Sequence, residues 1–252
     1  MFNRRDVIFL YDGSFYGLLT VIFVCYYTHT YPAGIEINEN VQQELLCDYE
    51  YIETDTDKAM RVEKSVLQKI SFKALHNIFY AYLSNMENKG ITIFNYIRAG
   101  YKFGRELDNH MVLDCVNDVL KAAQNVAHEA HLLTGFIRFS KLKNGAYYAQ
   151  ITPKNNVLPV IEEHFTERYG SMAFLIHDTR RNMCLVYNGT ESVIRTTVSL
   201  PKLEPADDEK EYQKLWKCFF DTVEIKERHN EMCQNNHLYK RFRKNMTEFN
   251  TY

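Results

Sequence analysis

The stretch FLIHDTRRNMCLVYNGTESVIRTTV, residues 174–198, decides the fold class of this chain. It holds three short runs rich in β-branched and aromatic residues, FLIHD, MCLVYNG and SVIRTTV, with turn residues between them, and such runs are typical of strands. No helical spacing links the three runs, so we expect them to form an antiparallel meander. The charged cluster HDTRR lies at the first turn of this meander.

Two further runs precede this stretch and extend the expected sheet. GFIRFSKL (135–142) and YYAQIT (147–152) are rich in strand-forming residues and are separated by KNG, which favours a hairpin. The segment NNVLPVIEEHFTERYG (155–170) returns to helical spacing before residue 174. We therefore expect a mostly antiparallel sheet over residues 133–200.

Helical periodicity dominates the residues before the sheet. Apolar residues recur at three- and four-residue steps from Thr56 to Met86, with Gly90 as the expected stop. Two more helices are expected over residues 92–102 and about 108–131. After a polar linker, residues 208–246 again show amphipathic helical spacing.

The predicted fold class is α+β, with a helical bundle in the N-terminal half plus a mostly antiparallel sheet flanked by C-terminal helices. We expect one α+β domain over residues 1–252. Its parts are a helix-rich region at 56–131, a sheet region at 133–200 and C-terminal helices at 208–246.

The first 54 residues predict mixed structure. Val7–Tyr11 reads as a strand that DGS stops, and either Asp12 or Ser14 is placed to cap a buried helix. Residues 35–54 favour one or two edge strands. The apolar run at residues 15–27 is too short to span a bilayer, and Asp6 and Asp12 interrupt any signal-peptide pattern. We expect a cytoplasmic protein with no membrane segment.

The charge of the chain is near neutral but unevenly distributed. A formal net charge of −2 over 252 residues excludes a uniformly cationic nucleic-acid binder. Residues 36–63 hold nine acids against two bases, whereas residues 226–244 hold six Lys and Arg against two Glu. The basic segment could contact phosphates or could form a solvated surface. The 18 Tyr and 16 Phe suit core and interface packing, and also base stacking.

The six cysteines argue against a metal cofactor held by thiolates. None forms a CxxC pair or has a cysteine neighbour at metal-ligand spacing. HEAH at residues 128–131 places two histidines at i and i+3 of a helix, but zinc needs a further ligand such as His164 or His177. We therefore expect no metal site and no cofactor.

Familiar catalytic fingerprints are missing from the chain, including GxGxxG, GxxxxGK[ST], GxSxG and HExxH. His177 and Asp178 are adjacent in an expected strand, so their side chains point to opposite faces and cannot easily act as a couple. His164, His177 and Asp178 stay the weak candidates for a catalytic role, as in a nucleic-acid-processing hydrolase.

Basic side chains next to aromatic ones predict phosphate or base contacts instead. In GFIRF, Arg138 would share a strand face with Phe136 and could clamp a phosphate or stack on a base, or else pair with Asp178 or Glu129. The turn-borne pair at 180–181 offers guanidinium donors, and YKRFRK at 239–244 would form a basic helical stripe or complement a helix dipole. The candidate nucleic-acid contacts are Arg138, Arg180, Arg181, Arg228, Lys240, Arg241, Arg243 and Lys244.

Several separated segments together carry a family resemblance. They are YDGSFYGLLT (11–20), LLTGFIRF (132–139), NVLPVIEEHF (156–165), IHDTRR (176–181), YQKLWKCFF (212–220) and IKERHN (225–230). In this order they resemble the bacterial DNA-repair or DNA-metabolism proteins built on domain of unknown function 4130. The matching positions are Asp12, Gly13, Gly135, Arg138, Pro159, His164, Asp178, Arg181, Trp216, Arg228 and Asn230.

The resemblance implies a role near DNA but no catalytic residues. Members of the family are associated with a radical-SAM iron–sulfur partner, or are fused to a uracil-DNA glycosylase-like domain. The sequence up to Tyr252 holds neither such a domain nor cluster-binding cysteines, so we expect any such activity in a partner. The leading hypothesis is a DNA-repair accessory protein that binds nucleic acid, the radical-SAM partner, or both. The rivals are a hydrolase with a His/Asp site and a protein-interaction scaffold.

Overall fold

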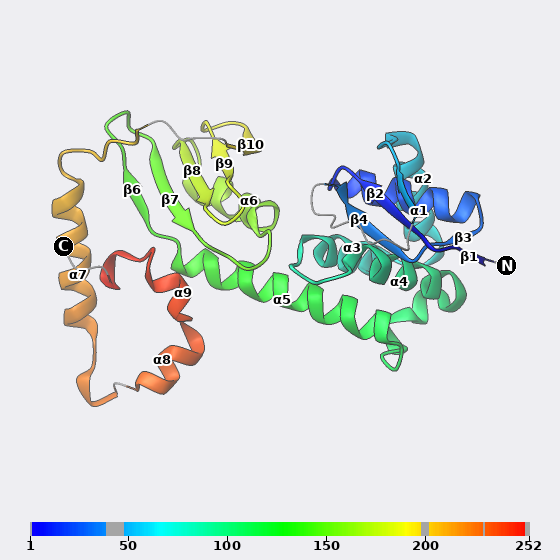
Figure 1. Cartoon of the computed structure of the whole chain (residues 1–252). Helices are drawn as coiled ribbons and strands as arrows, with labels where there is room; N and C mark the ends of the chain where they lie inside the picture. The colour runs from blue at the N-terminus through cyan, green and yellow to red at the C-terminus, as the bar shows by residue number, and fades with distance from the viewer. Residues whose placement is uncertain (1, 39–47, 198–201, 229, 250–252) are drawn as a thin grey trace. The chain divides into compact units, whose positions relative to one another are not determined.

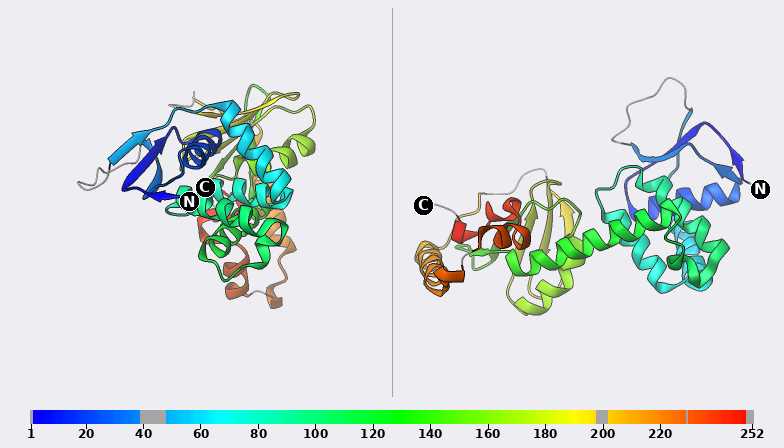
Figure 2. Two further views of the ribbon diagram at one scale, coloured as in Figure 1. Left: turned by 90° about the vertical axis from the view of Figure 1, so that its right-hand side faces the viewer. Right: turned by 90° about the horizontal axis from the view of Figure 1, so that it is seen from below.

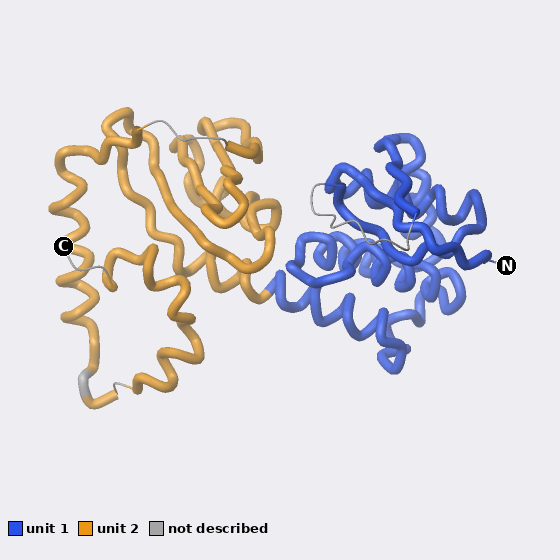
Figure 3. The backbone as a smooth tube through the Cα atoms, in the orientation of Figure 1, with its two compact units in different colours: residues 1–127 blue, residues 128–252 orange. Residues whose placement is uncertain are grey.

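The structure is a computed structural model and describes residues 2–38, 48–197, 202–228 and 230–249. The chain divides into two compact units, Met1–Ala127 and His128–Tyr252 (Figure 3). Both units combine helices with a sheet, so the α+β class is confirmed. The single domain expected from the sequence stays a prediction, because two compact units can still unfold as one.

Unit 1 is built on a three-stranded parallel sheet in the order β4-β2-β5. The central strand β2 (Val7–Tyr11) is buried along its whole length, as expected of a strand covered on both faces. The edge strands β4 (Gly34–Ile37) and β5 (Asp48–Tyr51) confirm the predicted edge strands, while residues 39–47 of that region lie outside the described residues. A small parallel pair joins β1 (Asn3–Arg4) to β3 (Thr30–Tyr31).

Helix α1 (Phe15–Tyr27) follows β2 directly and starts where the DGS segment turns the chain. The side-chain Oγ of Ser14 accepts a hydrogen bond from the Gly17 backbone N–H at 2.8 Å, so Ser14 is the N-cap. Asp12 Oδ1 in turn accepts from the backbone and hydroxyl of Ser14, at 2.9 and 2.7 Å. A side chain on Gly17 would collide with Asp12, so this closely packed turn requires glycine there.

The long helix expected from Thr56 to Met86 is two helices, α2 (Thr56–Lys69) and α3 (Phe72–Leu83). The prediction was wrong because Ser71 adopts an extended conformation and its side chain caps α3 through the Ala74 N–H, at 3.0 Å. Gly90 does not stop a helix but lies inside α4 (Lys89–Phe103), where its missing side chain lets the helix approach Ile35 closely.

The last helices of unit 1 lead into unit 2. Helix α4 ends at Gly104, whose φ of 59° is in the left-handed region that glycine favours. A 3-10 helix, η2 (Gly104–Asn109), precedes α5 (Asp114–Phe136), which runs through the boundary between the units. The helix expected at about 108–131 therefore starts later and ends later in the chain.

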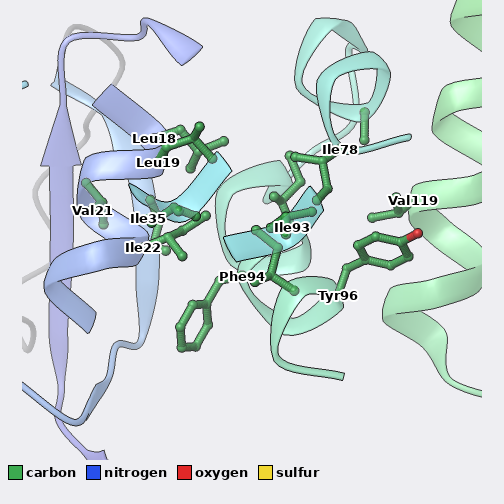
Figure 4. Close-up of a cluster of buried hydrophobic side chains, with 14 of the residues drawn as sticks. Leu18, Leu19, Val21, Ile22, Ile35, Ile78, Ile93, Phe94, Tyr96 and Val119 are labelled. Atoms are coloured by element: carbon green, nitrogen blue, oxygen red, sulfur yellow. The ribbon is translucent and has the colours of Figure 1, made fainter. Parts of the chain in front are cut away.

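The core of unit 1 is apolar and tightly packed. Figure 4 shows Leu18 and Ile22 of α1 beside Ile35 of β4, with Phe94 of α4 nearby. Tyr96, also from α4, points toward α5 and donates a hydrogen bond from its hydroxyl to an Asp108 carboxylate oxygen at 2.7 Å. The fully buried side chains come from all layers of the unit, so the sheet and helices share one core.

Unit 2 contains a five-stranded sheet in the order β10-β9-β8-β7-β6 (Figure 1). The meander β8 (Phe174–Asp178), β9 (Met183–Tyr187) and β10 (Ser192–Thr196) is antiparallel, and so is the hairpin of β6 (Phe139–Lys141) with β7 (Tyr147–Ile151). Both arrangements confirm the sequence-based prediction. Residues 198–200 of the predicted sheet region lie outside the described residues. The parallel pair β7–β8, joined by α6 (Leu158–Tyr169), was not predicted.

Arg138 does not lie in a strand, contrary to the prediction from GFIRF. The Ile137 N–H still donates to the Leu133 carbonyl at 3.0 Å, so helical geometry persists to Phe136, and β6 begins only at Phe139. The reason is packing: Ala130, Leu133 and Ile137 continue the buried stripe of α5. Arg138 therefore sits at the joint between helix and strand.

The C-terminal segment closes unit 2 with short helices (Figures 1 and 2). These are α7 (Glu209–Val223), η3 (Lys226–Arg228), α8 (Glu231–His237), α9 (Lys240–Arg243) and η4 (Thr247–Phe249). The helical spacing expected over residues 208–246 is thus confirmed only in pieces, because the chain breaks between α7, α8 and α9. Phe242 and Met246 reach the core formed by α5, α6 and the sheet. No helix among the described residues is long and apolar enough to cross a membrane.

Candidate functional site

The carboxyl ends of β7 and β8 meet at one edge of the unit 2 sheet. The two strands are parallel and Ile151 pairs with Asp178 in register, so the loops that follow them, 152–157 and 179–182, emerge side by side. Ligands commonly bind at this position in sheets with parallel strands. The HDTRR cluster, whose role was open from sequence, lies here.

Asp178 is fully buried at this edge and fixes the turn behind it. Its Oδ1 accepts the Arg180 backbone N–H at 2.9 Å, and its Oδ2 accepts Arg181 Nη1 at 2.9 Å. Arg181 also donates to the carbonyl oxygens of Pro153 and Lys154. The Arg181 guanidinium, predicted to contact phosphate, thus ties two loops together. Asp178 does not meet Arg138, as the sequence had suggested it might.

A second buried carboxylate holds the neighbouring loop. Glu129 of α5 accepts the backbone N–H groups of Lys154 and Asn155, at 2.9 and 2.8 Å, and the Asn155 side-chain amide at 2.8 Å. It also accepts Arg241 Nη2 at 3.0 Å, so the C-terminal segment is attached to the same loop. The Glu129 of the HEAH segment is therefore a structural anchor.

Charge at this edge is unbalanced in favour of cations. The carboxylates of Asp178 and Glu129 are each matched by one arginine, Arg181 and Arg241. Two exposed cations, Lys154 and Arg180, project from the same two loops. Neither has an ion-pair partner among the residues that the structure describes. An exposed positive patch on rigid loops can attract a phosphate.

The tail supplies two more exposed cations rather than the basic helical stripe expected from YKRFRK, in which Lys240, Arg243 and Lys244 would align. Lys240 and Lys244 are exposed and lie four residues apart at α9. Arg243 turns inward instead, where its Nη2 donates to Asn235 Oδ1 at 2.8 Å and its guanidinium lies 5.1 Å from the Phe249 ring centroid. The predicted stripe is shortened because the helix ends at Arg243.

Arg138 belongs to a separate cluster with the unpredicted partner Glu248. Its Nη2 and Nε lie 2.7 and 3.2 Å from the two carboxylate oxygens of Glu248, a bidentate pair. The indole N–H of Trp216 donates to the same carboxylate at 3.1 Å, and the Arg138 guanidinium lies 5.2 Å from the Trp216 ring centroid. Burial opposes ionisation of Glu248, but the Arg138 and Trp216 hydrogen bonds outweigh it and hold its pKa below the ordinary value.

Beside this cluster a cleft of about 570 Å³ lies between β6 and α7. The edge of β6 is covered there, because the Lys141 N–H donates to Glu209 Oε2 at 2.8 Å and the Lys141 carbonyl accepts the Ala206 N–H at 2.9 Å. The lining residues are Arg138, Phe139, Lys141, Tyr147, Glu209, Tyr212, Gln213, Trp216 and Thr247.

The weak catalytic candidates are not brought together. His177 lies on the opposite sheet face from Asp178, where its Nδ1 is 3.2 Å from the Tyr148 hydroxyl, and His164 is exposed on α6. Burial lowers the pKa of His177, against the opposing effect of Asp178. The geometry therefore assembles no His–Asp couple from these residues.

The remaining sequence candidates occupy surface positions. Arg228 is exposed in η3 and lines a shallow cleft of about 440 Å³ with Val223 and Cys233. His128 and His131 are exposed on either side of the buried Glu129. Among the described residues, no three His, Cys, Asp or Glu side chains are grouped as a metal ion would require.

Sequence reasoning missed Lys154, Glu209 and Glu248. For Lys154 a signal existed, because a polar loop between a strand and a helix with proline in its first turn is the connection expected after a strand of a βαβ unit. Glu209 lies in a capping segment and gave only a helix-start signal. Glu248 lies 110 residues from Arg138, and no local pattern could pair them.

The match to known proteins covers unit 2 and the last part of unit 1. No curated protein matches the chain. The model of a family defined by a domain of unknown function, DUF4130, matches residues 87–248. That range contains the basic edge, defined by the exposed cations Lys154 and Arg180 in the loops after β7 and β8. It also contains the Arg138–Glu248 cluster and the cleft, whereas Asp12 and Gly13 lie outside it. Because the match spans well over half of the sequence, the chain belongs to the DUF4130 family.

Proposed function

We propose that this chain is an accessory protein of DNA repair or DNA metabolism that binds nucleic acid at the carboxyl edge of β7 and β8. The observation that carries the proposal is the pair of exposed cations, Lys154 and Arg180, on loops that buried carboxylates hold in place. Lys240 and Lys244 extend the positive surface along the tail that Arg241 ties to the same loop.

The arrangement suits the phosphate backbone more than it suits base recognition. Four flexible cations, Lys154, Arg180, Lys240 and Lys244, can each neutralise a phosphate and release a counterion. The loops of Lys154 and Arg180 are already ordered, since Glu129 and Asp178 accept backbone N–H groups from them. Binding therefore pays little entropy to order these loops, and its strength should fall steeply with salt.

The direct test measures DNA affinity as a function of salt by fluorescence anisotropy, with single-stranded and duplex oligonucleotides. In the double variant Lys154→Ala/Arg180→Ala, the slope of log K against log[salt] should fall by about 2, because each lost phosphate contact removes about one unit. Adding Lys240→Ala and Lys244→Ala should weaken binding further by the same mechanism.

A matched control removes the same charges from unit 1. Arg105→Ala/Lys121→Ala deletes one exposed arginine and one exposed lysine, so the net charge changes equally. This control should keep the parental slope. Equal slopes for the two double variants, or negligible binding by the parent, would sink the nucleic-acid proposal. Arg138→Ala and Arg181→Ala are poor probes, because each leaves a buried carboxylate without its partner.

A protein partner is the second candidate, favoured by the exposed stripe of α7. Tyr212, Leu215, Phe219 and Val223 recur at helical spacing and are each more than half exposed, which is unusual for large apolar side chains on a solvated helix. The family resemblance implies that such a partner would be a radical-SAM iron–sulfur protein. With four apolar side chains at helical spacing, the stripe can receive an amphipathic helix of such a protein.

The partner proposal is tested by co-purification from the native host. Leu215→Glu and Phe219→Glu should abolish recovery of an iron–sulfur partner. The control Lys214→Glu, at an exposed position of α7 outside the apolar stripe, should retain it. Recovery that all three variants share equally would show that α7 is not the contact surface.

A further inference from the structure

We propose that the cleft between β6 and α7 binds a nucleobase attached to a phosphate, either in a free nucleotide or in a single-stranded segment. The inference rests on the proposed function for its setting, but it concerns different residues from the basic edge. The volume of the cleft, about 570 Å³, falls within the range of about 300–1,000 Å³ typical of small-molecule sites.

The walls of the cleft suit a flat aromatic ligand. Four of the lining side chains are aromatic, and they come from both sides: Phe139 and Tyr147 from the sheet, Tyr212 and Trp216 from α7. Base–aromatic stacking is a general way of holding an unpaired base. Among the described residues, no Leu, Ile or Val side chain lines the cleft.

Trp216 is held rigidly enough to act as a stacking platform. Its indole N–H is fixed on Glu248, and the Arg138 guanidinium lies close to its ring. Even so, 39% of its surface is exposed, and 61% of that of Tyr212. An ordered aromatic surface left open to solvent loses little conformational entropy when a ligand stacks on it.

Polar groups in the cleft match the remaining parts of a nucleotide. Glu209 is buried, yet it lines the cleft with Gln213, whose Nε2 donates to Glu209 Oε1 at 2.8 Å. A fixed carboxylate and amide can bond the edge of a base. Lys141 is half-exposed and 3.9 Å from Asp208, a weak pair that leaves its ammonium available to a phosphate.

The cleft is connected to the basic edge through the tail. Asn245 Nδ2 donates to Thr152 Oγ1 at 3.3 Å, and Thr152 belongs to the loop that leads to Lys154. Thr247, two residues further along, lines the cleft. A single-stranded nucleic acid whose phosphates contact the basic edge can therefore extend along this C-terminal segment and place a base in the cleft.

The experiment uses the intrinsic fluorescence of Trp216, the single tryptophan of the chain. Titration with nucleoside 5′-monophosphates should quench the emission in a saturable way, whereas ribose 5-phosphate, which has no base, should not. Tyr212→Ala should weaken the nucleotide affinity about ten-fold through lost stacking. Tyr27→Ala, which removes an exposed tyrosine of unit 1 outside the cleft lining, should leave the affinity unchanged.

Oligonucleotides separate the two sources of the base and the two proposals. If the ligand is a base within a nucleic-acid strand, an intact single-stranded oligonucleotide should quench Trp216, and an oligomer of the same length in which every site is abasic should not. If the ligand is a free nucleotide, the monophosphates should quench Trp216 and the oligonucleotides should not. Lys154→Ala/Arg180→Ala should leave the quenching by monophosphates unchanged. No saturable response to any nucleotide or oligonucleotide, or an equal response to ribose 5-phosphate, overturns the cleft proposal even if DNA still binds at the basic edge.

Discussion

The two units use different kinds of buried polar group. In unit 1 the buried polar residues among those described are neutral: Thr20, Thr30, Asn77 and Ser84. In unit 2 four of five are acids: Glu129, Asp178, Glu209 and Glu248, beside Asn155. Three of these acids pair with arginine. Buried ion pairs are weak contributors to net stability but costly to break, so unit 2 is the part whose geometry depends on charge.

The ion pairs of unit 2 join segments that are far apart in the chain. Arg138 and Glu248 are separated by 110 residues, and Glu129 and Arg241 by 112. Both pairs attach the C-terminal segment to the end of α5. The difference between the units teaches that most arginines predicted to contact nucleic acid hold this unit together, and that binding must rely on the cations left exposed.

The largest effect is expected in the core of unit 1. Phe94→Ala should lower the free energy of unfolding by about 3–5 kcal/mol, because it removes a fully buried ring from a core that has little room to collapse. Urea unfolding followed by far-UV circular dichroism measures the loss. The effect should be independent of salt, since no charge is involved.

The same variant tests whether the units unfold together. Trp216 fluorescence reports on unit 2 alone, because no other tryptophan is present. If its transition stays in place while the dichroism transition moves, the units unfold separately. If both transitions move together, the single domain expected from the sequence is supported.

The next effect concerns the buried carboxylate with the most partners. Glu129→Gln should destabilise the protein by about 3 kcal/mol, because it leaves the Arg241 charge unpaired and turns an amide N–H toward backbone donors. Urea unfolding followed by Trp216 fluorescence measures it. Glu163→Gln, an exposed change of the same kind on α6, is the control and should have no effect. Equal stability of the two variants would show that the buried pair contributes nothing.

Elements of the fold that depend on local pattern could be predicted from the sequence. The β8–β9–β10 meander and the β6–β7 hairpin follow from short apolar runs and their turn residues, and side-chain chemistry limits the cap of α1 to Asp12 or Ser14. The break at Ser71 was missed because apolar periodicity continues across it, so only the backbone shows that the hydroxyl caps a new helix. The sequence predicts an end of helix α5 near His131, five residues before its actual end, because the glycine and aromatic residues that follow resemble the start of a strand.

The candidate site was predictable in composition but not in pairing. HDTRR and YKRFRK were identified as basic clusters, and strand alternation correctly separated His177 from Asp178. The partners of Arg138 and Arg241 depend on contacts across more than a hundred residues, which no spacing rule can specify. The cleft was not predicted either, because its two walls come from β6 and α7 and only the folded chain brings them together.

A smaller and pH-dependent effect is expected at Glu248. Its pKa is lowered in the folded state, so its contribution to stability is present above the unfolded pKa of about 4.5 and is lost as the pH falls through the folded value. Glu248→Gln should cost about 2 kcal/mol at neutral pH, the scale of a charge-assisted hydrogen bond. It should also flatten the decline of stability in acid. Urea midpoints measured from pH 7 downward test this, and an unchanged acid slope would contradict it.

The smallest effect on stability is expected at Arg180, although its neighbour Arg181 is expected to have a large one. Arg180→Ala should change the free energy of unfolding by less than about 0.5 kcal/mol, because the side chain is exposed and only its backbone N–H bonds Asp178. Arg181→Ala should cost several times more, because Asp178 would be buried without its cation. Unfolding and DNA titrations of both variants provide the comparison. If Arg180→Ala lowers the salt slope at unchanged stability, binding and folding use adjacent arginines for separate purposes; if it destabilises as Arg181→Ala does, that separation fails.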